Sequence, residues 1–349
     1  LSEKKFNLSD LSASDFDLSE DGTPLLEDGT ETKKKTTPGI TINKSQRQLY
    51  QVQTNKRSTE SGTNLHPSYI KRKHLNQVMK SWQYPLHFID FETIAPAVPY
   101  YTSTSPYDMV AFQFSHHIIK SQNNDGSLEV EHASEFLHTE QGSPNVSFLK
   151  ALLNAIGSVE TDGGTVFQWS PHESHVLRSM LSSPEVSSSL SSQEISALSA
   201  ILKTGMVDLC KLATKYYYVD GSGGSSSIKR LLKSTLNASP QLKEIYGSPT
   251  YNSRNFDHFQ WYQLDDSGCA KDPYDIISEI NPNQHGSANV TEGGAACAAF
   301  HELQNNLDLD VHDRKSIENS LLRYCELDTL AMVMIFQAWL AMGQHIDQK

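Results

Sequence analysis

Apolar residues gather into strand-like runs between residues 86 and 132. Residues 86–92 form an apolar run rich in β-forming side chains that ends in carboxylates, which predicts a central strand. Residues 111–119 predict a second strand and residues 128–132 a third. Between these two strands, the Asn-Asp-Gly sequence at 124–126 is typical of a hairpin turn. Three neighbouring strands with one tight turn predict an antiparallel start to the sheet.

The pattern then changes to helical spacing. A fourth strand is predicted over residues 165–169, and helices over 146–156, 172–181, 194–202, 208–218, 226–236 and 293–307. Residues 313–342 carry a long apolar periodicity and predict a long final helix. Strands followed by alternating helices and strands predict an α/β or α+β sheet with helices packed on it.

Two parts of the chain lack such periodicity. Residues 1–75 have an acidic, serine-rich half followed by a basic half, which predicts a disordered or linker segment before a single domain over residues 76–345. A nucleic-acid-binding arm is the functional alternative for the basic half. Residues 237–292 contain scattered Pro, Gly, Asn and Asp, and we expect an irregular insertion or lid there rather than core.

Composition agrees with an unpacked segment beside a folded domain. The chain has 349 residues, of which 37% are hydrophobic, and its mean hydropathy is −0.47. No apolar run approaches the roughly 18 residues of a membrane helix, so we expect no membrane partner. The chain begins with Leu and shows no signal peptide, so we expect a fragment or a processed piece. Its four cysteines lack zinc-site spacing, which favours reduced thiols in a cytoplasmic protein.

The charge balance excludes one class of nucleic-acid-binding protein. The chain has 29 basic and 41 acidic residues and a net charge of −12, which argues against a non-specific DNA-coating protein. A nuclease stays possible, because an acidic metal site adds negative charge of its own and phosphate contacts need only a local basic face.

Carboxylates occur at positions where they could share a ligand. Asp90 and Glu92 are two residues apart on the central strand, so both point to one face. Two such carboxylates repel each other unless a cation neutralises them, and oxygen ligands suit Mg²⁺ or Mn²⁺. The alternative is a solvated strand end.

Further acidic candidates lie on helices. Tyr324 and Asp328 are four residues apart and share one helical face beside an apolar seam that includes Cys325, where an unpaired Asp is costly. The alternative is a surface Asp with a half-buried Tyr. Glu173 and Asp208 each begin a predicted helix, and ordinary capping explains both equally well.

The order of these pieces resembles the DEDD, or DnaQ-like, 3′–5′ exonuclease superfamily. A narrower resemblance, to the bacterial domain-of-unknown-function family 2779, covers roughly residues 80–340. It rests on FIDFET at 88–93, PY at 99–100, SPY at 105–107, FQFSHH at 112–117, SIK at 227–229 and YCELDTLAM at 324–332. Longer relatives carry an N-terminal nuclease-like module, similar to a CRISPR-associated type, which is expected to be missing here.

The resemblance implies a ribonuclease H-like mixed sheet, with three antiparallel strands first and then parallel strands, flanked by helices. It also implies a metal-dependent 3′–5′ exonuclease that hydrolyses phosphodiester bonds of single-stranded DNA or RNA with two Mg²⁺ or Mn²⁺ ions. The implied roles are metal ligation by Asp90, Glu92, Glu173 and Asp328, water orientation by Tyr324, support of the ligands by Asp208, and substrate contacts by Thr93 and Lys229.

The chain departs from the superfamily pattern at two positions. Glu173 stands where Asp is usual, and Trp169 stands where many members have Asn. The aromatic residues Phe91, Tyr107 and Trp169 could stack on bases, with core packing as the alternative. Two other functions remain open: a non-catalytic module that binds nucleic acid or protein on a nuclease-like fold, and a small-molecule phosphoesterase.

Overall fold

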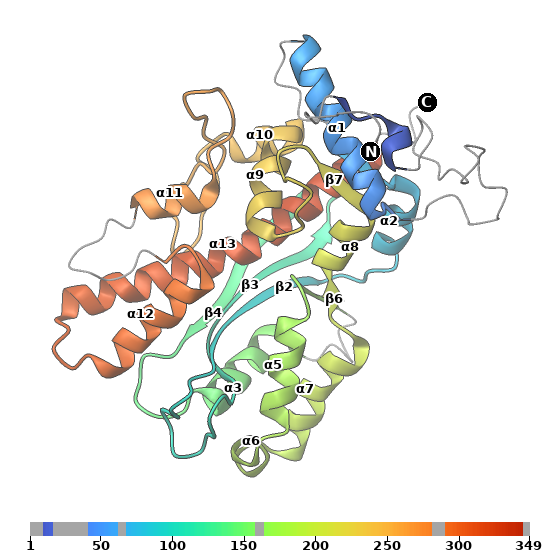
Figure 1. The fold of residues 1–349 in the computed structure, drawn as a ribbon. Helices are drawn as coiled ribbons and strands as arrows, with labels where there is room; N and C mark the ends of the chain where they lie inside the picture. Colours follow the sequence, from blue (N-terminus) through green and yellow to red (C-terminus); the bar gives the residue numbers. More distant parts are fainter. Residues whose placement is uncertain (1–9, 17–40, 62–67, 158–163, 281–289, 345–349) are drawn as a thin grey trace.

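A five-stranded mixed sheet lies at the centre of the computed structural model, which describes residues 10–16, 41–61, 68–157, 164–280 and 290–344 (Figure 1). The strand order is β4–β3–β2–β5–β6. The first three strands pair antiparallel and the last two extend the sheet in parallel, as predicted. The strands are β2 (Leu86–Ile94), β3 (Val110–Gln122), β4 (Leu128–Leu137), β5 (Thr165–Gln168) and β6 (Val207–Asp208).

Strand β2 is covered on both faces, which explains its nearly continuous apolar sequence. Phe88 faces one layer of helices, and Ile89 and Phe91 face the other, because side chains alternate along a strand. The same alternation turns Asp90 and Glu92 towards the layer that contains Phe88. The register of β2 with β3 shifts between Glu92 and Thr93, at the end of this run.

One face of the sheet is covered by four helices that follow β4 and β5 in the sequence (Figure 1). Phe148, Leu177 and Leu198 from these helices pack with Ile89 and Phe114 of the sheet in one buried cluster. The helices are α3 (Asn145–Ile156), α5 (His172–Leu181), α6 (Pro184–Ser189) and α7 (Ser192–Thr204).

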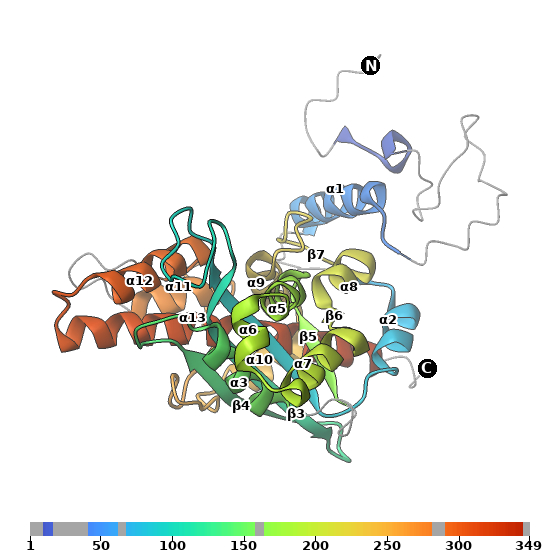
Figure 2. The ribbon, with the colours of Figure 1, turned by 90° about the horizontal axis from the view of Figure 1, so that it is seen from below.

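The opposite face is covered by a long helix, α13, and by shorter helices around it (Figures 1 and 2). By length and composition α13 could cross a membrane, which the sequence analysis did not expect, but 83% of its apolar window is buried inside the protein. It is therefore the central core helix of this layer. The layer contains α8 (Leu209–Tyr216), α9 (Ile228–Ala238), α10 (Pro240–Tyr246), α11 (Pro273–Ile280), α12 (Gly293–Asn305) and α13 (Val311–Gln344).

Part of the N-terminal segment is packed, so the prediction of an unpacked segment over residues 1–75 is wrong there. Helix α1 (Lys44–Ser61) lies beside β7 (Tyr217–Val219), which pairs antiparallel with β1 (Ser68–Ile70) (Figure 2). Helix α2 (Arg72–Met79) follows β1, and a short 3₁₀ helix precedes α1 at Ala13–Phe16. The other residues of this segment, 1–9, 17–40 and 62–67, lie outside the described part.

Among the side chains described in and just before α1, up to residue 53, few apolar ones are buried, which is why its sequence looked unpacked. Ile42, Leu49 and Val52 are buried in an otherwise polar stretch. The Arg47 guanidinium donates hydrogen bonds to the carbonyl oxygens of Ala213 and Tyr217, both at 3.0 Å. These contacts are made with distant residues, so the sequence pattern of α1 alone did not reveal them.

The segment 237–292, predicted to be irregular, contains the helices α10 and α11 joined by irregular residues, and it is part of the core. Trp261 and Ile277 are fully buried, and Tyr274 is 4% exposed. These side chains pack with α13 in one apolar cluster, so the prediction of a lid outside the core is wrong. Residues 281–289 lie outside the described part. The helix predicted over 208–218 ends at Tyr216, because the following residues form β7.

Candidate metal centre

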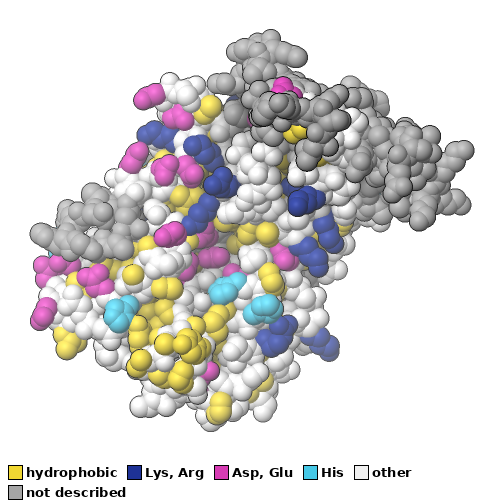
Figure 3. Space-filling model, in the orientation of Figure 1, with side chains coloured by type: hydrophobic (Ala, Val, Ile, Leu, Met, Phe, Trp, Pro, Cys, Tyr) yellow, Lys and Arg dark blue, Asp and Glu magenta, His cyan; other side chains and the backbone are white. Residues whose placement is uncertain are grey.

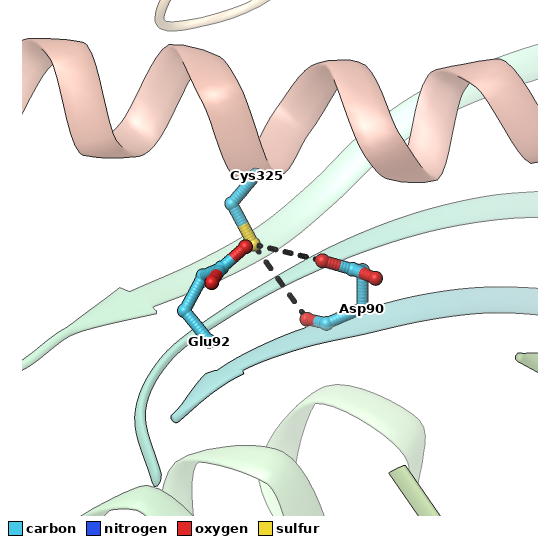
Figure 4. A group of neighbouring side chains, drawn as sticks. All are labelled: Asp90, Glu92 and Cys325. Carbon is cyan, nitrogen blue, oxygen red and sulfur yellow. Dashed lines mark hydrogen bonds between the residues drawn. The ribbon is translucent and has the colours of Figure 1, made fainter. Parts of the chain in front are cut away.

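Strand β2 brings Asp90 and Glu92 together on the face that packs against α13. One ligand atom from each carboxylate and the Cys325 sulfur lie within 4.8 Å of one another (Figure 4). The Cys325 thiol on α13 donates to the Asp90 backbone oxygen at 3.6 Å and to its Oδ2 at 3.7 Å. The predicted sharing of one face is confirmed, whereas the sequence analysis treated Cys325 only as an apolar contact of its helix.

Helix α13 supplies the third carboxylate. Asp328 is 6% exposed, and the Tyr324 hydroxyl hydrogen-bonds to it from the preceding turn, as the four-residue spacing predicts. Cys325 lies three residues before Asp328, so it shares this helical face. The resulting face of α13 presents two oxygen-bearing groups and a thiol to strand β2.

The turn from β5 into α5 positions Glu173. Ser170 in this turn has a φ of 80°, a left-handed conformation that reverses the chain sharply before the helix begins. Glu173 is 2% exposed, and its carboxylate accepts a hydrogen bond from the backbone N–H of Phe91. Its Oε2 is buried without a hydrogen-bond partner. Glu173 is thus held against the β2 backbone at Phe91, with one oxygen left for another ligand.

The four carboxylates Asp90, Glu92, Glu173 and Asp328, here called the candidate metal centre, perturb one another. Burial and then the charge of Asp328 raise the pKa of Asp90 and of Glu92 well above their ordinary values, and Glu173 adds to both effects. Burial raises the pKa of Glu173 to about 8 and that of Asp328 to about 6. Full ionisation of this group therefore needs added positive charge.

Asp208 lies behind Glu173. Its Oδ1 accepts the backbone N–H of Lys211 at 2.9 Å, which caps α8, and that of Ser170 at 3.3 Å. Its negative charge also raises the pKa of Glu173. Asp208 therefore holds the turn that carries Glu173, which agrees with the supporting position expected for it.

Lys229 begins α9 and lies beside the centre. Its Nζ is 5.0 Å from the ring centroids of both Tyr274 and Tyr324, and it donates to the backbone oxygen of Thr291. Its charge lowers the pKa of Asp328, and it acts on Glu92 in the same way. The ammonium group is thus held close to the carboxylates by two aromatic faces.

Thr93 follows the register shift at the end of β2. Its hydroxyl lies 3.2 Å from His172 Nε2, and its backbone oxygen accepts the Cys297 thiol at 3.2 Å. Thr93 is therefore next to the centre, with its hydroxyl already in contact with the first turn of α5.

Tyr274 is a residue of the centre that the sequence analysis missed. It lies on α11, and its hydroxyl donates a hydrogen bond to Asp328 Oδ1. This hydrogen bond favours the ionised form of Asp328, since it lowers the pKa that burial raises. The local sequence carries no signal for this contact, because Tyr274 lies in the segment 237–292, which was predicted to be an irregular insertion outside the core.

Two of the three aromatic residues considered for base stacking belong to the core. Phe91 is 3% exposed and packs edge-on against Phe148. Trp169 is 9% exposed, and its indole N–H donates to the Ser226 backbone oxygen at 3.1 Å. Tyr107 is 71% exposed, so it is the one of these three rings that can still meet a ligand.

The face shown in Figure 3 carries both signs of charge near the centre. Acidic side chains gather in the middle of this face, between α9 and α5, with Lys and Arg side chains above them and histidines below. Although the net charge of the chain is negative, a phosphate-bearing ligand needs only a local group of basic side chains. Such a group lies beside the acidic side chains on this face.

The fold and this site define an α/β protein with a buried carboxylate cluster between a mixed sheet and its core helix. A family model described as "Domain of unknown function (DUF2779)" matches residues 87–227, which agrees with the narrower resemblance to that family over part of the range 80–340. The match includes Asp90, Glu92 and Glu173, whereas Tyr324 and Asp328 lie beyond it. Searches of curated proteins and of solved structures found no match.

Proposed function

We propose that the protein is a metal-dependent nuclease, and more narrowly a 3′–5′ exonuclease that hydrolyses single-stranded DNA or RNA by a two-metal mechanism. The observation that carries the proposal is the convergence of four carboxylates with raised pKa values from β2, α5 and α13. The strand order supports a ribonuclease H-like form of the fold, with three antiparallel strands followed by two parallel ones.

The donor set fits hard divalent cations. The centre offers carboxylate oxygens, which suit Mg²⁺ and Mn²⁺, and the unpartnered Oε2 of Glu173 provides an oxygen that no protein group satisfies. Asp90 is only partly buried, so a solvent-borne ligand can reach the group. Asp90, Glu92, Glu173 and Asp328 would hold the ions, which would activate a water and neutralise the charge on the phosphate oxygens.

Protein groups around the centre would orient the reacting partners. Burial and then the charge of Asp328 raise the pKa of Tyr324, so its hydroxyl keeps its proton and is unsuited to act as a base. Its oxygen can accept a hydrogen bond from the attacking water while its own proton is donated in the hydrogen bond to the Asp328 carboxylate. The ammonium group of Lys229, held beside the same carboxylate, can contact a substrate phosphate.

Cleavage of labelled nucleic acids tests the proposal. Linear and circular single-stranded DNA and RNA are incubated with Mg²⁺ or Mn²⁺, and with excess chelator. We expect shortening of linear substrates from the 3′ end, no cleavage of circles, and no activity in chelator. Asp90→Asn should abolish cleavage, whereas Glu129→Gln, at an exposed position of β4, should preserve it.

Other outcomes point to the alternatives. Binding of nucleic acid without cleavage would favour a non-catalytic module. Hydrolysis of a nitrophenyl phosphodiester alone would favour a small-molecule phosphoesterase. Undiminished cleavage in excess chelator would contradict the metal mechanism itself.

A further inference from the structure

A second group of ligand-type side chains is buried on the other side of α13. His132 and Glu135 come from β4, and Glu326 comes from α13, two residues before Asp328. One ligand atom from each lies within 4.8 Å of the others. Asn255, from the segment between α10 and α11, joins them: its Nδ2 lies 2.7 Å from Glu135 Oε2 and 2.8 Å from Glu326 Oε2.

The spacing of these atoms matches a coordination shell. His132 Nδ1 is 3.2 Å from Glu326 Oε2, and Asn255 Nδ2 lies 2.7 and 2.8 Å from the two carboxylates, whereas Glu135 Oε2 approaches the other ring nitrogen of His132, Nε2, at 3.8 Å. In an octahedral shell with bonds of about 2.1 Å, neighbouring ligand atoms lie about 3 Å apart. The group therefore has about the size of a shell around a small divalent cation.

The histidine of this group carries a buried ring nitrogen without a hydrogen-bond partner. The side chain of His132 is 2% exposed, yet its Nδ1 has no hydrogen-bond partner although it lies against the Glu326 carboxylate. Its other ring nitrogen, Nε2, is in hydrogen-bond contact with the Ser115 hydroxyl at 3.3 Å. A contact at Nε2 with an unpaired Nδ1 is the arrangement of a metal-ligating imidazole, whose second nitrogen is held by an outer partner.

Outer partners also fix the buried carboxylate. Tyr251 donates a hydrogen bond to Glu326 Oε1, and His117 Nε2 lies 2.9 Å from the same hydroxyl. Arg323 supplies part of the compensating charge, since it lowers a Glu326 pKa that burial raises. One oxygen of Glu326 is thus oriented by the protein, and the other faces His132 and Asn255.

We propose that His132, Glu135 and Glu326 bind a divalent transition-metal ion, with Asn255 as a fourth ligand. The Asn255 amide would turn by 180° about its last torsion, so that Oδ1 replaces Nδ2 at the same place. One imidazole nitrogen and three oxygens, without a thiolate, suit Mn²⁺, Fe²⁺ or Zn²⁺ better than Mg²⁺. The ion would tie β4 and α13 to the segment that also carries Tyr274.

Nitrogen coordination separates this site from the candidate metal centre. The test uses the full chain with Asp90→Asn and Asp328→Asn, which disable that centre, and adds Mn²⁺. We expect one bound Mn²⁺ per chain, a higher melting temperature, and a ¹⁴N signal in pulsed electron paramagnetic resonance. Carboxylate oxygens of the first centre cannot give a directly coordinated ¹⁴N signal.

Further variants assign the signal. His132→Gln should remove it and weaken Mn²⁺ binding by more than tenfold, and Glu135→Gln, 13% exposed and so tolerant of change, should weaken binding similarly. His312→Gln is the matched control, because His312 lies in an exposed group with Asp310 and Asp313 and its loss should change nothing.

Three results would overturn the site. These are Mn²⁺ bound without a ¹⁴N signal, a ¹⁴N signal that survives His132→Gln, and no Mn²⁺ binding below about 1 mM, the weak end of protein cation sites. None of these results depends on nuclease activity, so this inference and the proposed function can fail separately.

Discussion

Replacing Glu173 by Gln should stabilise the metal-free protein at pH 8 while it destroys metal-dependent cleavage. The pKa of Glu173 is about 8 in the folded chain, because of burial and the neighbouring acids Asp208 and Asp328. The folded state therefore holds this proton more tightly than the unfolded chain does. Stability is then highest below the ordinary pKa of 4.5 and falls as the pH rises towards 8.

The size of the effect follows from the two pKa values. Each tenfold change in proton affinity corresponds to about 1.4 kcal/mol. A rise of the Glu173 pKa from 4.5 to about 8 thus corresponds to a pH-dependent contribution of up to about 5 kcal/mol to the free energy of unfolding. The contribution is smaller if Asp90 or Asp328 holds the shared proton in place of Glu173. Gln carries no proton to lose, so the variant should lack most of this pH-dependent loss.

Urea unfolding in excess chelator at pH 5 and pH 8 measures the difference. The wild-type free energy of unfolding should fall between the two pH values, and that of Glu173→Gln should fall much less. Asp208→Asn is the matched control: Asn caps α8 as well as Asp does, and the proton on Glu173 remains, so most of the pH dependence should persist.

Two results would refute this reasoning. Equal pH dependence for the wild type and Glu173→Gln would show that Glu173 does not hold the proton. Cleavage within about threefold of wild type in Glu173→Gln, together with its loss in Asp208→Asn, would reverse the roles of the two acids, since threefold is less than 1 kcal/mol.

Three further predictions follow from other contacts. Asp90→Asn should abolish metal-dependent cleavage without lowering the melting temperature in chelator, because it removes one of four mutually repelling acids; a large drop would contradict this. Tyr274→Phe should raise the pKa of Asp328 above about 6 and move the acid limb of the pH–kcat/KM profile to higher pH, since it removes a hydrogen bond to the ionised form; an unmoved limb would exclude this role. Arg47→Ala should destabilise the fold by about 1–3 kcal/mol, measured by urea unfolding, because backbone carbonyls lose a charged donor; unchanged stability would mean that α1 is not held there.

Strand and helix periodicity predicted the parts of the candidate metal centre that local geometry determines. A spacing of two on a strand puts Asp90 and Glu92 on one face, and a spacing of four on a helix does the same for Tyr324 and Asp328. That these faces are buried did not follow from the sequence, which left a solvated strand end and a surface Asp open as alternatives. The placement of Glu173 rested on the resemblance, since capping explained its position equally well.

Contacts between distant segments could not be predicted in this way. Arg47 reaches backbone carbonyls more than 160 residues away, and nothing in its neighbouring sequence indicates them. Cys325 was assigned to the apolar seam of its helix, although its thiol faces Asp90. Arg47 is a polar residue in a polar stretch, and Cys325 is an apolar-type residue in an apolar stretch. Neither breaks the hydrophobic pattern around it, so the pattern gives no reason to single it out.

The segment 237–292, before α12, was predicted to lie outside the core because its contacts are also made with a distant part of the chain. The buried carboxylates on α13 show why it belongs to the core. Glu326 and Asp328 lie in the buried part of α13, at 0% and 6% exposure, where an unpaired carboxylate is costly. Both accept hydrogen bonds from outside that helix, and the segment before α12 supplies them: Tyr251 donates to Glu326 and Tyr274 to Asp328. An acidic residue inside an apolar helix therefore predicts that polar side chains elsewhere are packed against it, even where their own sequence shows no regular pattern.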